Sequence, residues 1–220
     1  MNQLDSRLRL CASFVRPGAR VADIGTDHAY LPVWLCANGI CPSAIAADIN
    51  PEPLQSGRRA VEAAHLEDKI KLRLSDGLRE IAADEADDIV IAGMGGELIA
   101  RIIGACDYAR DPEKRFILQP MTRSEELLRW LCAGGFQILR QDCCVAANKC
   151  YTVLLVQYTG ENRSYDTLYP YLGELHPKDN PTHLRFVEGH ISRLLKQAKG
   201  DARFAVLAKD LQAACGKEPT

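Results

Sequence analysis

The stretch from Val21 to Pro32 constrains the fold of this chain more than any other. An apolar run from Val21 to Ile24 precedes a short turn at Gly25, and a segment of helical character follows from Tyr30 to Ala37. A strand, a tight glycine turn and a helix form the opening of a nucleotide-binding α/β fold. Gly25 lacks a Cβ, so a ligand could approach its backbone closely. The stretch therefore predicts a cofactor site, although a plain structural turn with solvated acids is the alternative.

Two carboxylates flank this turn and favour one class of cofactor. Asp23 and Asp27 lie on either side of Gly25, and no second or third glycine follows within the turn. Carboxylates would repel the pyrophosphate of a dinucleotide, whereas they attract the amino group and the sulfonium of S-adenosylmethionine (SAM). The charges therefore predict SAM as the cofactor and disfavour a nucleotide-linked dehydrogenase.

The sequence then predicts further strands at residues 43–48, 69–74, 87–92 and 115–118. The first three of these end on or are followed by acids or glycines, and the last is followed by Gln119-Pro120. Asp48 ends the second strand, where a carboxylate can accept hydrogen bonds from both hydroxyls of a ribose; a helix cap before Pro51 is the alternative. Asp76 follows the third strand and could bind an adenine amine, or it could simply form a turn with Gly77.

The fourth strand runs into Gly93-Met94-Gly95-Gly96, which would let backbone press against a ligand. Met94 offers a soft surface for a flat base, or it fills the core behind a glycine-rich connector. Helices are expected at 4–14, 51–65, 97–103 and 124–133, the last capped by Ser124. The final strands, 136–140 and 151–158, are separated by residues 142–150 and suggest an antiparallel hairpin. Seven strands with that hairpin are the layout of the Rossmann-like SAM-dependent methyltransferase fold.

The character of the chain changes after Gly160, so we expect a methyltransferase domain over residues 1–160 and a helical domain over 161–220. Residues 165–171 predict an aromatic loop, and a helix capped by Thr182 is followed by a second helix after Gly200. Six Lys and Arg residues against two acids make residues 181–209 basic. This segment is a candidate surface for a polyanion, although the charge by itself favours a solvated helix face.

Composition narrows the protein class. The net charge of −2 excludes a global basic field that would recruit nucleic acid, so such binding needs a local patch. Nine scattered cysteines without a Cys-x-x-Cys pair indicate reduced thiols in a cytoplasmic protein, and they do not predict a zinc site. We expect neither a signal peptide nor a membrane span, because no suitable apolar run is present.

Four motifs together resemble one bacterial family. They are Leu4-Asp5-Ser6-Arg7-Leu8, the run from Asp23 to Pro32, Ile91-Ala92-Gly93-Met94-Gly95-Gly96, and Gln119-Pro120. The chain resembles the tRNA (adenine-22-N1)-methyltransferases, often called TrmK, from residue 4 to about 160 and more loosely through the tail. The resemblance implies SAM as methyl donor, N1 of adenosine 22 in tRNA as acceptor, and a small coiled-coil-like C-terminal domain. We expect a monomer or weak dimer without a metal.

The resemblance also implies roles for individual residues. Those expected to line the cofactor are Asp23, Gly25, Asp48, Ile49, Asp76, Gly77, Gly93 and Gly95. Those expected to face the acceptor base, as catalytic residues, are Asp27, His28, Tyr30 and Met94. Those expected to hold RNA phosphates are Arg7, Arg9, Arg185, Arg193 and Lys196.

A mechanism follows from the acceptor atom. N1 of neutral adenine carries a lone pair, so the enzyme has mainly to position and desolvate the base. Asp27 could stabilise the cationic product, or His28 could take a proton from the exocyclic amine.

Two alternatives remain open: a methyltransferase for another RNA base or a small molecule, and a non-catalytic RNA-binding protein that keeps the fold. Amino-methylating enzymes carry an Asn/Asp-Pro-Pro-aromatic motif where this chain has Gly93-Met94-Gly95-Gly96, which argues against exocyclic methylation.

Overall fold

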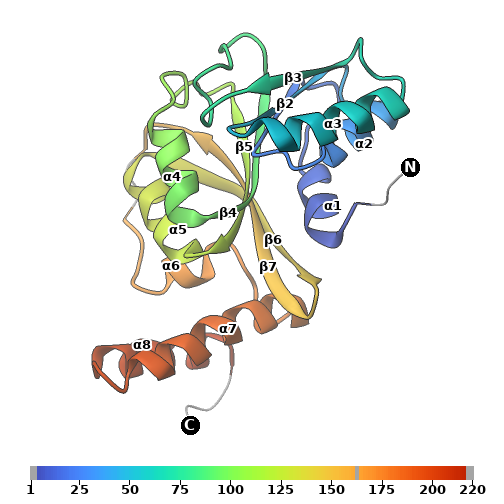
Figure 1. Cartoon of the computed structure of the whole chain (residues 1–220). Helices are drawn as coiled ribbons and strands as arrows, with labels where there is room; N and C mark the ends of the chain where they lie inside the picture. The colour runs from blue at the N-terminus through green and yellow to red at the C-terminus, as the bar shows by residue number, and fades with distance from the viewer. Residues whose placement is uncertain (1–3, 162–163, 217–220) are drawn as a thin grey trace.

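The computed structural model describes residues 4–161 and 164–216. Within them, seven strands form one sheet in the order β3-β2-β1-β4-β5-β7-β6 (Figure 1). Strands β1 to β5 run parallel, whereas β7 is antiparallel to both of its neighbours. This topology confirms the predicted Rossmann-like methyltransferase fold. The strands are β1 (Val21–Ile24), β2 (Ala44–Asp48), β3 (Ile70–Leu74), β4 (Asp88–Gly95), β5 (Arg115–Thr122), β6 (Phe136–Ala146) and β7 (Lys149–Tyr158).

Helices cover both faces of the sheet because its strands are apolar on both faces. On β4, Ile89 and Ile91 point into one core and Val90 points into the other. The first core is closed by α4 (Gly96–Gly104) and α5 (Ser124–Ala133), and the second by α1 (Ser6–Ala12), α2 (Tyr30–Ala37) and α3 (Pro51–Ala63). The alternation of side chains along each strand thus explains the three layers.

The final hairpin is longer than the sequence predicted. Ala146 pairs with Lys149, so most of residues 142–150 belongs to β6 and β7 rather than to a connector. Ala147 and Asn148 form the turn with φ values of 45° and 63°. A two-residue turn with positive φ at both positions matches the twist of a hairpin, and this explains why the strands continue to its tip.

Three local predictions were wrong. The expected aromatic loop contains a short helix, α6 (Tyr169–Leu172). Ser124 is the first residue of α5 rather than its cap. The cap of the next helix is Asn180, which accepts hydrogen bonds from the N–H groups of Thr182 and His183, so Thr182 does not cap it. Asp5 caps α1, because its side chain accepts a hydrogen bond from Leu8 N at 2.9 Å.

The C-terminal segment forms the predicted pair of helices, α7 (Pro181–Gln197) and α8 (Arg203–Ala214). They share an apolar cluster with residues such as Val187 and Leu211, and Cys143 of β6 joins it. Helix α7 therefore packs against the hairpin, below the sheet in Figure 1. A division into two domains at residue 160 stays a prediction. No helix of the described residues is both long and apolar enough to cross a membrane.

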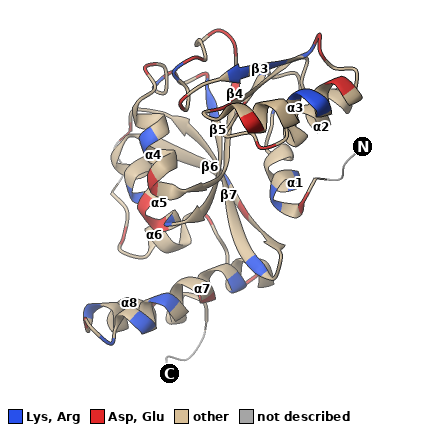
Figure 2. Ribbon diagram, viewed as in Figure 1, with Lys and Arg blue, Asp and Glu red and all other residues tan. Residues whose placement is uncertain are grey.

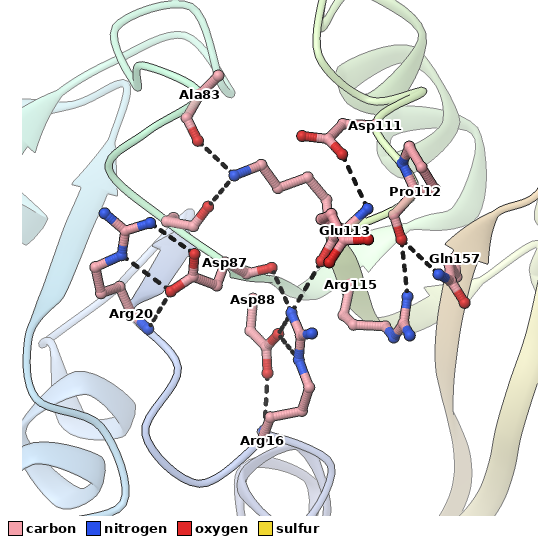
Figure 3. Close-up of polar contacts among 12 residues, drawn as sticks. Arg16, Arg20, Ala83, Asp87, Asp88, Asp111, Pro112, Glu113, Arg115 and Gln157 are labelled. Atoms are coloured by element: carbon pink, nitrogen blue, oxygen red, sulfur yellow. Dashed lines mark hydrogen bonds and ion pairs between the residues drawn. The ribbon is translucent and has the colours of Figure 1, made fainter.

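A polar network ties the strands together at the edge where β1, β4 and β5 begin (Figure 3). Asp88 has a fully buried side chain and forms an ion pair with Arg16 at 2.6 Å. Arg20 pairs with Asp87 at the same distance, and both of these side chains are partly exposed. Lys114 Nζ donates to the carbonyl oxygens of Ala83 and Ala86. This network joins the amino ends of the parallel strands. The candidate site lies at the opposite edge of the sheet, where these strands end.

Candidate active site

Backbone hydrogen bonds hold the turns after β1, β2 and β3 side by side. Gly25 N and Thr26 N both donate to Ala47 O, at 2.8 and 2.9 Å, and Ser75 N donates to Asp48 O at 2.9 Å. These bonds continue the parallel pairing beyond the strands themselves. The turns therefore lie along the carboxyl edge, where ligands of open α/β sheets bind.

A cavity of about 490 Å³ opens at this edge, within the range of small-molecule sites. It brings together residues from the loop after β1, the end of β4 and helix α1. Its lining includes Asp5, Arg7, Asp23, Gly25, Thr26, Asp27, His28, Tyr30 and Gly93. Seven predicted site residues, Arg7 among them, thus surround one cavity.

Two glycines give the cavity its backbone walls. Gly25 and Gly93 have φ values of 76° and 79°, which side chains rarely adopt. A Cβ added to Gly25 would overlap Cε of Met94, whereas nothing lies within 4 Å of a Cβ built on Gly93. Met94 also packs against the core beneath α4 and α5. Its side chain thus supports the turn at Gly25 and fills the core, and Met94 is not among the residues that line the cavity. The contact of Met94 with an acceptor base stays a prediction.

Asp23 is the most unusual titratable group of the cavity. Its side chain is buried at the end of β1. Burial, together with the charge of nearby Asp48, raises the pKa of Asp23 to about 6. A buried carboxylate without a cationic partner is unfavourable, so the site favours a ligand that brings positive charge. The chemistry of this residue therefore fits the cationic end of SAM.

Asp27, His28 and Tyr30 form the rim of the cavity. Asp27 is 81% exposed, and its Oδ2 lies 3.4 Å from Nε2 of His28. The rings of His28 and Tyr30 stack with centroids 4.9 Å apart. The rim thus offers a carboxylate and a stacked aromatic surface, which suits a flat heterocycle that gains positive charge.

Five predicted cofactor residues lie outside the lining of this cavity, and four of them lie at or just after the ends of β2 and β3. Asp48 caps its own turn by accepting from Asn50 N at 2.8 Å, and the apolar side chain of Ile49 beside it is 60% exposed. Asp76 lies 3.1 Å from Arg79, and Gly77 packs against Ile102 of α4. Asp48, Ile49 and Asp76 remain at the carboxyl edge, where a nucleoside could extend from the cavity along β2 and β3.

Gly95 faces elsewhere, because a Cβ on it would lie 3.3 Å from Oγ1 of Thr122 on β5. Its predicted contact with the cofactor therefore has no support from its position. The close approach of two strands explains this glycine instead.

Gln119 is a site residue that the sequence reasoning did not assign. It is fully buried at the end of β5, and its Oε1 accepts from Gly93 N at 3.1 Å and from Arg7 Nη1 at 3.4 Å. Arg7 also forms an ion pair with Asp5 at 2.6 Å. Arg7 was expected to hold RNA phosphates, yet it lies in the cavity wall. Arg7 and Gln119 both belong to the motifs, but their contact joins positions 112 residues apart in the chain.

The other predicted RNA-binding residues lie apart from this cavity. Arg9 on α1 donates to Leu4 O at 3.4 Å. Arg185, Arg193 and Lys196 lie on α7, where cationic residues follow the helix (Figure 2). Among residues 4–161 and 164–216, no group of His, Cys, Asp and Glu is arranged to hold a metal ion. None of the nine cysteines, all of which lie among the described residues, forms a disulfide bond.

Comparison with known proteins identifies the family. Residues 4–154 match the family model described as a methyltransferase domain. A tRNA (adenine(22)-N(1))-methyltransferase of Bacillus subtilis is 38% identical over 164 residues, which cover 74% of this chain and 69% of that protein. The chain belongs to the family of tRNA (adenine(22)-N(1))-methyltransferases. The resemblance inferred from the motifs is therefore confirmed.

Solved structures agree over nearly the whole chain. Streptococcus pneumoniae Sp1610, assigned as a tRNA (m1A22) methyltransferase and solved with S-adenosyl-L-methionine, is 33% identical with a TM-score of 0.88. The match covers 97% of this chain and 100% of that one. Mycoplasma capricolum TrmK with S-adenosyl-homocysteine is 25% identical with a TM-score of 0.80, covering 97% and 96% of the two chains. The structural similarity therefore extends over the C-terminal helices of the present chain.

Proposed function

We propose that this chain transfers the methyl group of SAM to N1 of adenosine 22 in tRNA. The observation that carries the proposal is the cavity that joins buried Asp23 to the rim of Asp27, His28 and Tyr30. Methyltransferases of the family act at that tRNA position according to their names. Because the substrate is tRNA, we place the enzyme in the cytoplasm.

The residues at the carboxyl edge fit SAM along its length. When bound, SAM supplies an electrophilic methyl group on its sulfonium. Asp23 would attract its cationic end, Asp48 would accept hydrogen bonds from the ribose, and exposed Ile49 would pack against the adenine. Asp76 would accept from the adenine amine if it released Arg79. Gly93 leaves open space beside its backbone for the ligand, whereas the missing side chain of Gly25 makes room for Met94.

The rim residues would prepare the acceptor base. The ring of Tyr30, stacked on His28, offers a flat surface on which an extruded adenine can lie. The lone pair of N1 needs no prior deprotonation, so holding the base in line is the main contribution. The carboxylate of Asp27 would stabilise positive charge that develops on the base, and His28 would accept a proton from the exocyclic amine.

Methyl transfer from radiolabelled SAM to unmodified tRNA transcripts tests this function. We expect label on the transcript with adenosine 22 and none when another nucleotide replaces it. Label that persists after the replacement would contradict the assigned position. In the same assay, Asp27→Asn should lower kcat by about 10- to 100-fold, while the affinity for SAM stays close to wild type. Full activity of this variant would remove Asp27 from the mechanism.

A further inference from the structure

A second cavity lies between the sheet and the C-terminal helices. It has a volume of about 300 Å³ and is formed by the β5–α5 turn, the β6–β7 turn and helix α7. Its lining includes Arg123, Lys149, Arg185 and Arg193, and it includes no Asp or Glu. Segments far apart in the sequence thus place four cationic side chains around one hollow, which we call the cationic cavity.

Nearby carboxylates offset only part of this charge. Arg193 lies 2.9 Å from Oε1 of buried Glu125, whereas Arg123 lies 3.8 Å from Glu97 and both of these side chains are more than half exposed. Arg185 donates to the carbonyl of Asn148, which is uncharged. The exposed ammonium of Lys149 adds further positive charge. The cationic cavity is therefore an anion-attracting site, and its guanidinium groups suit phosphate oxygens.

His190 adds no charge to this site. It lines the cavity, but burial and the neighbouring guanidinium of Arg193 lower its pKa to about 3. The imidazole is therefore neutral at physiological pH, and the attraction for an anion comes from the lysine and the arginines alone.

Gly189 of α7 leaves open space in the cationic cavity. It lies four residues from both Arg185 and Arg193, so the three positions share one face of α7. A glycine within a helix costs about 1 kcal/mol relative to alanine. No atom lies within 4 Å of a Cβ built on Gly189, so packing does not require its small size. The missing side chain instead leaves open space between the two arginines.

The cationic cavity adjoins the active-site cavity. Met121 and Tyr151 line the first, and Arg7 lines the second. Arg7 Nη1 lies 3.3 Å from Met121 Sδ, and the guanidinium of Arg7 lies 5.6 Å from the centre of the Tyr151 ring. These contacts make a shared wall. A polynucleotide could therefore place a base in one cavity and a neighbouring phosphate in the other.

We propose that the cationic cavity binds a backbone phosphate of the RNA close to the nucleotide that is methylated. The proposal rests on the proposed function for the identity of the RNA, and it adds Arg123 and Lys149 to the predicted RNA contacts. Lys196, a predicted contact on the same helix, is not among the residues that line the cavity. Phosphate contacts position a nucleic acid without reading its sequence, so the site would set the register of the base.

Removing charge at the cavity tests the proposal. We compare Lys149→Gln and Arg185→Gln with Lys178→Gln, an exposed lysine that precedes α7 and does not line the cavity. We expect each cavity variant to raise the KM for tRNA by about 5-fold and to reduce the salt dependence of tRNA binding by about one ion. The values for kcat and SAM affinity should stay near wild type. Equal effects of all three substitutions would overturn the proposal, because they would show only a diffuse field.

Filling the cavity tests it without changing charge. Gly189→Leu places a side chain in open space and improves helix propensity, so the protein should fold and bind SAM normally. We expect tRNA affinity to fall by at least about 10-fold, since the side chain would displace the phosphate. Wild-type tRNA affinity in this variant would contradict a phosphate inside the cavity.

The proposed function fails separately from this inference. Loss of the adenosine 22 requirement in the wild-type enzyme would overturn the assigned reaction. The phosphate site is tested by the difference in tRNA binding between the cavity variants and the Lys178→Gln control. This binding measurement requires no methyl transfer.

Discussion

At the scale of single residues, the site depends on groups that are costly for the fold. Asp23 is a carboxylate in a buried position, and Gly25 has a backbone that other residues rarely adopt. Gln119 accepts hydrogen bonds from the N–H of Gly93 and from one nitrogen of Arg7, which joins the end of β4 to helix α1. These arrangements are costly in a free protein, and a cationic ligand at Asp23 would offset part of that cost.

The raised pKa of Asp23 predicts pH-dependent binding of SAM. The ionised carboxylate attracts the ligand, so below the pKa of about 6 a proton must first be released. We expect SAM affinity to be constant above about pH 7 and to be about tenfold weaker at about pH 5. Calorimetric titrations at several pH values measure this. The variant Asp23→Asn should bind SAM weakly at every pH, and its affinity should no longer fall between about pH 7 and about pH 5.

The matched control for this titration is Asp27→Asn, which removes the exposed carboxylate on the other side of Gly25. The SAM affinity of this variant should fall with pH as it does in the wild type, because Asp23 remains. Affinity that does not change between about pH 7.5 and about pH 5 in the wild type would contradict the role of Asp23.

At the scale of elements, the two ends of the parallel strands serve different purposes. The carboxyl ends open into glycine turns and the active-site cavity, while the amino ends are joined by ion pairs (Figure 3). Arg16 Nε and Nη2 and its backbone N all contact Asp88 or the backbone beside it. Stability and binding are therefore concentrated at opposite edges of one sheet.

The two ion pairs at the amino ends should differ in strength. Arg16→Met leaves the buried carboxylate of Asp88 unpaired, so we expect a loss of about 3 kcal/mol in the free energy of unfolding. Arg20→Met breaks a partly exposed pair and should cost about 1 kcal/mol or less. Urea denaturation of both variants at neutral pH compares them. A loss for Arg20→Met as large as that for Arg16→Met would contradict the argument from burial.

At the scale of the whole molecule, the C-terminal helices are attached through a buried polar cluster. His190 of α7 lies 3.4 Å from Ser124 Oγ and 2.7 Å from a nitrogen of Arg193. The second oxygen of Glu125 lies 4.0 Å away, and the rings of Tyr171 and Phe186 pack edge-on against the imidazole. This cluster fixes α7 relative to α5 and so places the cationic cavity beside the active site.

The neutral state of His190 predicts that acid weakens the structure. Its pKa is lowered in the folded protein, so the unfolded chain binds more protons below about pH 6.5, and stability falls as the pH falls. We expect a loss of about 1.4 kcal/mol from this group between about pH 7.5 and about pH 5.5. Asp23, whose folded pKa is raised, has the opposite sign in the free protein.

The comparison of wild type with His190→Gln isolates this effect, because every other group stays the same. The difference between the denaturant midpoints at the two pH values should be smaller for His190→Gln than for the wild type. An unchanged pH dependence in His190→Gln would show that another group is responsible.

The sequence by itself determined the order of elements and the chemistry of the site. Strand and helix periods are local properties, so the parallel strands, the acids that follow them and the glycine turns could be identified from neighbouring residues. The charges of Asp23 and Asp27 around Gly25 also sufficed to predict SAM, which the family comparisons confirm.

Only the tertiary structure decided which distant residues share a cavity. Arg7 was expected at a phosphate but lies beside Gln119, and the strands 136–158 continue to a tip that brings Lys149 to α7. Such contacts join residues far apart in the chain, and no local period encodes them. They follow from the register of the sheet and from the helices that pack on it, because these place side chains in three dimensions.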